Sequence, residues 1–375
     1  MVMKRAWAGV LAVLLGAMCV AGCSKKADVI STEGQTETKA TQASTEAETE
    51  AETEEASELP EGYMYSYVTG LPITVEQGGQ RPVAIMLNNA EAAVPQSGIN
   101  QASVIYEAPA EGGINRLMAI FEMENLSGLE KIGSVRSART YFVYYAAEFR
   151  AMFVHFGQAK FAELHLQTAY CDNLNGLETS GDGVFYRTSD RKSPHNAYTS
   201  EAGIQQGIEH MQYNRYYSLY DGFDPYEGTV RFAHGEEVTL DDGMDAQKVI
   251  PGYPINEPWF EYDAASGEYL RYQYGGAHVD DAGVQLATKN ILILSTPCDH
   301  YYDTSYLDFH VQAGGTGYYI TNGKAIQITW EKPEEWGVTH YYDASGNEID
   351  LNPGKTWICV VQQTLEGDIQ ILGQE

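Results

Sequence analysis

The run Pro82-Val83-Ala84-Ile85-Met86-Leu87 decides the fold. Six consecutive residues without a polar side chain predict a strand that is buried on both faces. Val104-Ile105-Tyr106 and Leu117-Met118-Ala119-Ile120-Phe121 have the same character and predict two further strands of this kind. A sheet that is buried on both faces needs other elements to cover it, so this part of the chain is expected to be layered.

Helical periodicity supplies those covering elements. Residues 137–149 place Phe142 and Tyr145 on one face and predict a helix, and residues 160–169 and 198–211 predict two more. A short strand is expected between the first two helices, at residues 153–156. Strands interleaved with helices indicate a mixed α/β domain over residues 61–225.

Strands and turns dominate the rest of the chain. Asn322-Gly323 stands between two β-rich runs at residues 318–321 and 324–330, which is a strong short-range signal for a hairpin. Residues 269–274 alternate in polarity and residues 290–294 are continuously apolar, so both predict strands. We therefore expect a β-rich domain over residues 226–375, as a sandwich or a barrel-like sheet, and an α+β protein as a whole.

The N-terminus has the residue pattern of an export signal. Lys4 and Arg5 precede an apolar run, and the string Val20-Ala21-Gly22-Cys23 ends it. The run is shorter than the roughly 20 residues needed to span a bilayer, which disfavours a transmembrane helix. Residues 1–22 resemble a bacterial lipoprotein signal peptide. That resemblance implies cleavage before Cys23, fatty acylation of its sulfur and anchoring to the lipid bilayer, with the protein on the extracytoplasmic face of the cell membrane.

An acidic tether is expected to follow the anchor. Residues 23–60 are rich in Thr, Glu, Ala and Ser and contain no aromatic residue, so they cannot bury enough surface to fold. Residues 24–60 would reach about 120–130 Å when fully stretched, and would average roughly 30–35 Å as a flexible coil. The folded part would therefore stand off the membrane.

Charge and cysteine content exclude several classes of protein. The net charge is −29, and −24 of it lies in residues 61–375, which carry 18 Lys or Arg and 42 Asp or Glu. A surface this acidic repels phosphate backbones and argues against nucleic acid as a partner. Cys171, Cys298 and Cys359 are scattered without a Cys-x-x-Cys pair, so buried free thiols are favoured over a metal or redox centre, although one disulfide remains open. Neither a metal nor a cofactor is predicted.

Arginines near turns and element starts are the first candidates for a site. Arg136 and Arg139 lie about one turn apart at the start of a predicted helix, where guanidinium groups and free N–H groups favour an anion. The alternative is that these arginines pair with Glu107, Glu111 and Glu148 and hold the domain together. The candidate ligand-binding residues are Asn88, Asn89, Arg116, Arg136, Ser137, Arg139, Arg187, Arg191 and Asn196.

No complete catalytic motif is present. Glu107, Glu111, His155 and His195 are the weak candidates for an acid or a base, because they flank the predicted strands or the polar loop at residues 185–196. A histidine in such a position is more often a hydrogen-bonded structural residue than a catalytic base.

Longer strings resemble a known family. Residues 81–89, 95–98, 132–139 and 193–198, together with Tyr106-Glu107 and Glu111-Gly112-Gly113, are similar to the first half of the YerB-like lipoproteins. Asn322-Gly323-Lys324, Trp330-Glu331-Lys332 and residues 353–357 are similar to the second half, so the resemblance spans residues 65–372. It implies a membrane-tethered, extracytoplasmic protein in two parts without an established reaction. One departure stands out: His155-Phe156-Gly157-Gln158-Ala159 replaces an expected His-x-Gly-Gly-Ser.

Three functions remain open from the sequence. The first is an envelope protein that binds or regulates, with a peptidoglycan fragment or a membrane-bound wall-synthesis protein as the partner. The second is a hydrolase or transferase acting on a wall polymer or glycan, with the arginines holding an anionic group. The third is a solute-capturing lipoprotein, which the small β-rich second part fits poorly.

Overall fold

The computed structural model describes residues 59–217, 231–235 and 237–374. The expected signal peptide, Cys23, the expected tether up to residue 58 and the expected boundary between residues 225 and 226 lie outside the described residues. Within the described part, no helix combines the length and the apolar character needed to cross a membrane.

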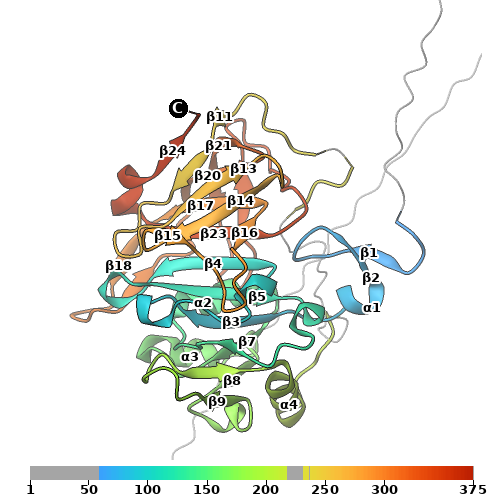
Figure 1. The fold of residues 1–375 in the computed structure, drawn as a ribbon, viewed down its shortest axis with the longest axis vertical. Helices are drawn as coiled ribbons and strands as arrows, with labels where there is room; N and C mark the ends of the chain where they lie inside the picture. The colour runs from blue at the N-terminus through green and yellow to red at the C-terminus, as the bar shows by residue number, and fades with distance from the viewer. Residues whose placement is uncertain (1–58, 218–230, 236, 375) are drawn as a thin grey trace, which may run out of the picture. The chain divides into compact units, whose positions relative to one another are not determined.

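One large sheet joins the two halves of the chain (Figure 1). Its central strand β23 pairs in parallel with β17 on one side and with β4 on the other, so a strand from the C-terminal half lies against one from the N-terminal half. The strand order is β11-β21-β20-β17-β23-β4-β5-β3-β7-β8, and β22 also pairs with β21. The bounds are β3 Val83–Asn88, β4 Val104–Pro109, β5 Asn115–Phe121, β7 Met152–His155, β8 Asn173–Asn175, β11 Met244–Asp245, β17 Asn290–Thr296, β20 Gly315–Thr321, β21 Lys324–Glu331, β22 His340–Tyr342 and β23 Thr356–Gln362.

A second sheet of six strands packs beside the large one. Its order is β15-β14-β13-β12-β24, and β16 pairs with β14. The bounds are β12 Lys248–Ile250, β13 Trp259–Asp263, β14 Glu268–Gln273, β15 Gly276–Ala277, β16 Ala287–Thr288 and β24 Gln370–Leu372. The smaller sheets are β1 Tyr63–Tyr65 with β2 Pro72–Thr74, β6 Ile132–Gly133 with β10 Ala197–Thr199 and β9 Phe185–Arg187, and β18 Cys298–His300 with β19 Leu307–Phe309.

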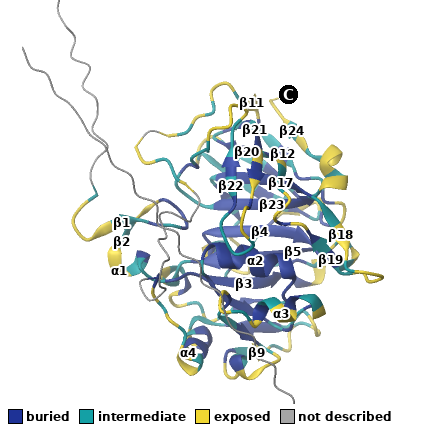
Figure 2. Ribbon diagram, turned by 180° about the vertical axis from the view of Figure 1, so that it is seen from behind, coloured by how far each residue is buried: buried dark blue, intermediate teal, exposed yellow. Residues whose placement is uncertain are grey.

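Both faces of the large sheet are covered, which explains the continuous apolar strands. Helix α2, Thr140–Glu148, covers one face, and its residues are buried all round (Figure 2). Helix α4, Glu201–Met211, and the six-stranded sheet cover the other face, where Val249 and Phe260 join Ile291 and Trp357 in one cluster. The remaining helices are short: α1 Val75–Gly78 and α3 Glu163–Leu166, with 3-10 turns that include η3 Glu111–Gly113 and η5 Lys160–Ala162.

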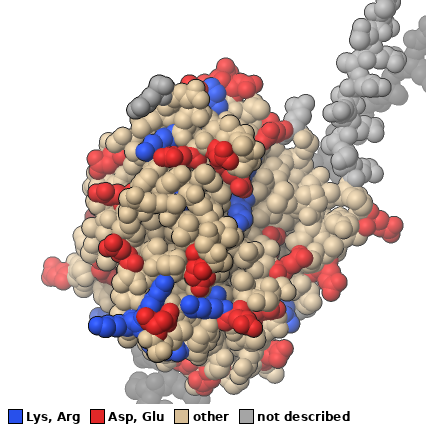
Figure 3. All heavy atoms as spheres, viewed as in Figure 1, with Lys and Arg blue, Asp and Glu red and all other residues tan. Residues whose placement is uncertain are grey.

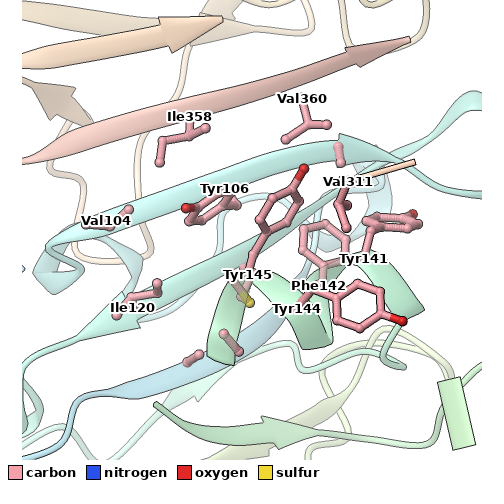
Figure 4. Close-up of a cluster of buried hydrophobic side chains, with 14 of the residues drawn as sticks. Val104, Tyr106, Ile120, Tyr141, Phe142, Tyr144, Tyr145, Val311, Ile358 and Val360 are labelled. Atoms are coloured by element: carbon pink, nitrogen blue, oxygen red, sulfur yellow. The ribbon is translucent and has the colours of Figure 1, made fainter. Parts of the chain in front are cut away.

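The core around α2 is aromatic (Figure 4). The rings of Tyr106 and Tyr145 stack with their centroids 4.6 Å apart, and Tyr141 contacts Phe309 from the C-terminal half. Val360 of β23 belongs to the same cluster. The two halves of the chain therefore share one hydrophobic core as well as one sheet.

The α+β class expected from the sequence is confirmed. The run that begins at Pro82 forms β3, which pairs in parallel with β7 and antiparallel with β5. Asn322-Gly323 is the turn of the hairpin β20–β21. The β-rich half, however, does not close into a sandwich or barrel of its own, because β17, β20 and β21 extend the sheet of the first half.

All three expected helices are shorter than predicted, and α2 covers Thr140–Glu148 instead of residues 137–149. Tyr198 lies in β10, and the hydroxyl of Ser200 accepts a hydrogen bond from the Gly203 N–H, so α4 begins only at Glu201. The expected helix over residues 160–169 is a 3-10 turn followed by the single turn α3. It stops because the Asn173 side-chain amide donates to the Leu166 carbonyl (2.8 Å), which a longer helix would have used itself.

Candidate functional site

The carboxyl ends of three parallel strands meet at one edge of the large sheet. β3 and β4 both run antiparallel to β5, and β7 runs parallel to β3, so all three end on the same side. Loops at this edge of an open sheet are the usual place for a ligand in layered α/β structures. The loop after β4 carries Glu111, and Arg116 stands near the beginning of β5 at the same edge.

Backbone hydrogen bonds hold the segment before α2 along this edge. The Arg136 N–H donates to the Met86 carbonyl (2.9 Å), and the Ala138 N–H donates to the Gly157 carbonyl (2.9 Å). These bonds insert residues 134–139 between the ends of β3 and β7. Arg136 and Arg139, the pair predicted from their spacing, are thereby carried to the position of Arg116.

Two arginines share one carboxylate there, and the charge of a third, Arg136, acts on the group. Arg139 binds Glu111 through two hydrogen bonds, with Nε 2.6 Å from Oε1 and Nη2 on Oε2, and Arg116 lies 4.0 Å from the same carboxylate. Arg136 makes a long contact of 3.5 Å with the Pro194 carbonyl. Among the described residues, Glu111 is the one carboxylate within ion-pair distance of these guanidinium groups. We call Arg116, Arg136, Arg139 and Glu111 the arginine cluster.

The pKa values in the arginine cluster record crowded positive charge. Burial, followed by the charges of Arg139 and Arg136, lowers the pKa of Arg116 to about 9. Burial and the charge of Arg139 also lower the pKa of Arg136. Partial burial raises the pKa of Glu111, but the hydrogen bonds and charges of Arg139 and Arg116 outweigh it, so the Glu111 pKa lies below its ordinary value. The cluster therefore keeps its carboxylate ionised and has a surplus of positive charge.

His195 and Asn88 border the cluster. The Asn88 amide nitrogen lies 2.8 Å from His195 Nδ1, and the Asn88 oxygen accepts from the Ala90 N–H, which fixes the amide orientation. Nδ1 is therefore the acceptor, and a neutral ring carries its proton on Nε2. Burial and the charges of Arg136 and Arg191 lower the His195 pKa, so the ring is neutral near pH 7 and offers an N–H donor.

The remaining candidate ligand-binding residues make contacts within the protein itself. Arg191 donates to the carbonyls of Ala93 (2.6 Å) and Pro95 (2.7 Å). Arg187 donates to Asn196 Oδ1 (2.8 Å) and lies over the Phe156 ring. The Ser137 hydroxyl donates to the Phe156 carbonyl (3.1 Å). On the face seen in Figure 3, basic side chains gather near the lower left with acidic ones between them.

Glu107 and Asn89 belong to a buried network instead of an open site. Glu107 is fully buried and accepts hydrogen bonds from Arg271 (2.6 Å) and Trp357 (3.0 Å) of the C-terminal half. It also accepts from Asn115 and Asn256. Asn89 exchanges two hydrogen bonds with Gln273 of β14. The network ties the large sheet to the six-stranded sheet, so Glu107 is a structural residue.

The predicted pairing of arginines with acids holds for one acid of three. Glu111 pairs with Arg139 as expected. Glu107 pairs with Arg271, and Glu148 pairs with Lys332 (3.0 Å), so both use partners from the C-terminal half. These partners lie more than 160 residues away in sequence, which no local pattern could reveal.

His155 is also a buried structural residue. Its ring nitrogens lie 2.8 Å from the Gly157 carbonyl and 3.2 Å from Asn173 Oδ1, and burial lowers its pKa. The loop in which this chain departs from the expected His-x-Gly-Gly-Ser turns inward as well. Gln158 there accepts from Asn175 (2.9 Å) and donates to Glu178 (3.2 Å), and neither contact involves an arginine.

An aromatic group from the C-terminal half stands next to the cluster. The connection between β18 and β19 carries Tyr301, Tyr302 and Tyr306, which surround Phe161 at centroid distances of 4.2, 6.1 and 5.8 Å. The Arg139 guanidinium lies 5.5 Å from the Tyr306 ring centroid, and Tyr302 is 85% exposed. Sequence reasoning missed these four residues, although three tyrosines in one polar turn are a usable signal of an exposed aromatic surface.

The cysteines that the structure describes are free thiols. Cys171 and Cys359 are buried and Cys298 is partly exposed. Burial is the first cause that raises the pKa of Cys171 to about 12 and that of Cys298 to about 11, so both are protonated near neutral pH.

Comparison with known proteins identifies the relatives of this chain. Residues 68–214 match the N-terminal domain, and residues 250–358 the C-terminal domain, of a family described as "Protein of unknown function (DUF3048)". A protein of Bacillus subtilis (strain 168) named "Putative lipoprotein YerB" is 31% identical over 305 residues, which are 78% of this chain and 85% of that protein. The crystal structure of the YerB protein from Bacillus subtilis superposes with a TM-score of 0.70 at 29% identity, covering 82% of this chain and 99% of that one.

Proposed function

The chain belongs to the DUF3048 family of YerB-like proteins, and from this premise we propose that it is a lipid-anchored binding protein of the cell envelope. In this proposal Cys23 holds the protein on the extracytoplasmic face of the membrane. Its folded part binds a wall saccharide that carries a carboxylate or a phosphate, at the arginine cluster. The signal-like N-terminus and the name of the Bacillus relative support the anchor.

The arginine cluster is the single observation that carries the ligand class. Two guanidinium groups pair with one carboxylate, and a third adds its positive charge, in a folded region whose net charge is −24. Burial and, after it, the crowding of positive charge are unfavourable here, and together they lower the pKa of Arg116. An anion placed there would offset that repulsion and would accept charge-assisted hydrogen bonds from planar donors.

The aromatic group next to the cluster favours a saccharide over a bare ion. Sugar rings present C–H faces that pack against aromatic side chains, and Phe161, Tyr301 and Tyr302 offer such a surface. Because Arg139 reaches the ring of Tyr306, the charged group and the ring of one ligand could be held side by side.

The contacts support binding better than they support hydrolysis or group transfer. Glu107 is fully buried and has four hydrogen-bond donors around it, so it cannot reach a substrate. Glu111 is held by Arg139 with a lowered pKa, which makes it a poor proton donor.

The test is a titration with two anionic probes. The muramic acid disaccharide supplies a carboxylate, and a glycerol phosphate oligomer supplies phosphates. Arg136→Gln should lower the affinity for the probe by about tenfold or more, because a charge-assisted hydrogen bond contributes about 1.5–3 kcal/mol. Glu111→Gln should strengthen binding, since it removes the one negative charge of the cluster. Added salt should weaken binding.

Arg231→Gln is the matched control, because it removes the same charge from an exposed pair with Asp350 outside the cluster. Its affinity should stay near wild type. Binding that is indifferent to Arg136→Gln, or a loss of binding in Glu111→Gln, would contradict the proposal. Cross-linking that captured a membrane protein through this surface without any saccharide affinity would favour the wall-synthesis partner instead.

A further inference from the structure

A hollow on the C-terminal half shares no lining residue with the arginine cluster. It is open to solvent and has a volume of about 370 Å³ beside β12, β13 and β24. Trp259, Pro258 and Ile250 form its apolar wall. Cavities of roughly 300–1,000 Å³ with apolar walls and a few polar groups are typical of small-ligand sites.

The aromatic wall is held in a fixed orientation. The Trp259 ring stacks on Tyr272 with centroids 4.9 Å apart and planes 9° apart. The two residues face each other across the β13–β14 pair, so both side chains lie on the same face of the sheet. The indole N–H donates to Glu261 (2.7 Å), which prevents the ring from turning. A ligand therefore meets an indole that is already oriented.

The loop over residues 251–258 frames the hollow and is anchored at two points. The Tyr253 hydroxyl contacts the carbonyls of Glu107 (2.9 Å) and Val360 (3.1 Å) in the large sheet. The Asn256 amide donates to the Glu107 carboxylate (2.9 Å) and to Gln273 (3.1 Å). Tyr253 and Asn256 are both buried. The site is thus preformed, which reduces the entropy lost on binding.

A glycine sets the far wall. Gly252 has a φ of +87°, and a Cβ at this position would lie 2.9 Å from the Asp368 carbonyl carbon. Only glycine lets the chain before β24 approach this closely. Asp368 and Gln370 consequently line the hollow opposite Trp259.

The polar groups of the hollow have mixed character. Lys248 places its amine 5.1 Å from the Trp259 ring centroid, and Glu257 and Asp368 add two carboxylates. Gln370 adds an amide. Two carboxylates against one amine disfavour an anionic ligand, and a purely apolar ligand would strip water from all three charges. Hydroxyl groups satisfy such a mixture, because each can donate to a carboxylate and accept from an ammonium or an amide.

We propose that this hollow is a second saccharide site, which binds a neutral, hydroxyl-rich sugar ring stacked on Trp259. Because Tyr272 already stacks on the indole, the sugar's C–H face would take the place of the flexible Lys248 side chain over the ring. Its hydroxyls would bond Asp368, Glu257 and Gln370. This inference is independent of the arginine cluster, since it shares no residue with it.

Calorimetric titration of the full folded region with a soluble tetramer of N-acetylglucosamine tests the proposal. Wild type should bind, and Trp259→Ala should weaken binding by about tenfold or more because the stacked face is lost. Trp259→Phe should retain most of the affinity, since it keeps an aromatic face. Gln370→Ala, an exposed position with no role in the core, should also weaken binding.

Tyr170→Ala is the matched control, because Tyr170 is likewise a surface aromatic stacked on a tryptophan, here Trp336. Tyr170→Ala and Arg136→Gln should both leave the affinity for the tetramer unchanged. The proposal is overturned if wild type gives no binding at millimolar tetramer, or if Trp259→Ala and Gln370→Ala bind as wild type does. A proline-rich peptide that binds at Trp259 while the tetramer does not would also overturn it.

Discussion

Replacing Glu107 by Gln is expected to destabilise the whole folded region. Glu107 and Arg271 form an ion pair (2.6 Å) in which both side chains have an exposed fraction of 0%. Trp357, Asn115 and Asn256 donate to the same carboxylate. The substitution keeps the volume, removes the charge, and turns an NH₂ donor toward groups that are themselves donors.

The expected magnitude follows from that burial. Removing one partner of a buried ion pair leaves the other charge uncompensated and costs about 3–5 kcal/mol. Arg271 retains one hydrogen bond to the Tyr272 carbonyl (2.7 Å) and contacts with the rings of Phe260 and Trp357, which places Glu107→Gln at about 3 kcal/mol rather than 5.

Urea unfolding followed by circular dichroism measures this loss. Asp245→Asn is the control, because it breaks the surface pair with Lys324 (2.8 Å) by the same chemical change. It should cost less than about 1 kcal/mol. A Glu107→Gln variant within 1 kcal/mol of wild type would refute the structural role. Loss of a ligand or an activity at unchanged stability would return Glu107 to the catalytic candidates.

Three further predictions concern pH and the anchor. Glu111→Gln should lower stability by about 1–3 kcal/mol at pH 7. That difference should vanish as the pH falls from 4.5 through the lowered pKa of Glu111 in the folded protein. Urea titrations of the wild type and of Glu111→Gln would measure it. His278 has a pKa well below 6.5, because burial and the charge of Arg271 oppose protonation. Stability present above pH 6.5 should therefore be lost as the pH falls, by up to about 1.4 kcal/mol per pH unit, and the slope should be smaller in His278→Gln. Cys23→Ser should abolish acylation and move the protein out of the detergent phase, as mass spectrometry of the N-terminus and phase partitioning would show.

Much of the fold could be predicted from short stretches of the sequence. The runs at residues 82–87 and 117–121 predicted buried strands, because a strand covered on both faces needs apolar residues without alternation. Asn322-Gly323 predicted its hairpin, since this pair adopts the backbone angles that a tight turn requires. Both signals depend on a few neighbouring residues.

The pairing of β23 with β4 could not be predicted from the sequence. The two strands are separated by more than 240 residues, and their parallel contact makes one sheet of what the sequence presented as two domains. A continuous apolar strand indicates that both of its faces are buried, but it does not specify which strand pairs with it.

The spatial grouping of the candidate residues was predicted in part. The spacing of Arg136 and Arg139 correctly placed them together, because both belong to one short segment. Their partner Arg116 and the tyrosines of the β18–β19 connection arrive from other parts of the chain. Glu107 was misread as a site candidate, since its burial depends on Arg271.

By itself, the sequence determined what rests on neighbouring residues: the signal grammar before Cys23, the acidic composition, the class of each major strand and the Asn322-Gly323 turn. Only the tertiary structure decided which charged groups are exposed and which are buried. Exposure and charge balance are properties of a site's surroundings, and here long-range strand pairing brings those surroundings together. Glu107 and Glu111 stand four residues apart, yet one is sealed beneath the six-stranded sheet and the other holds an arginine at the edge.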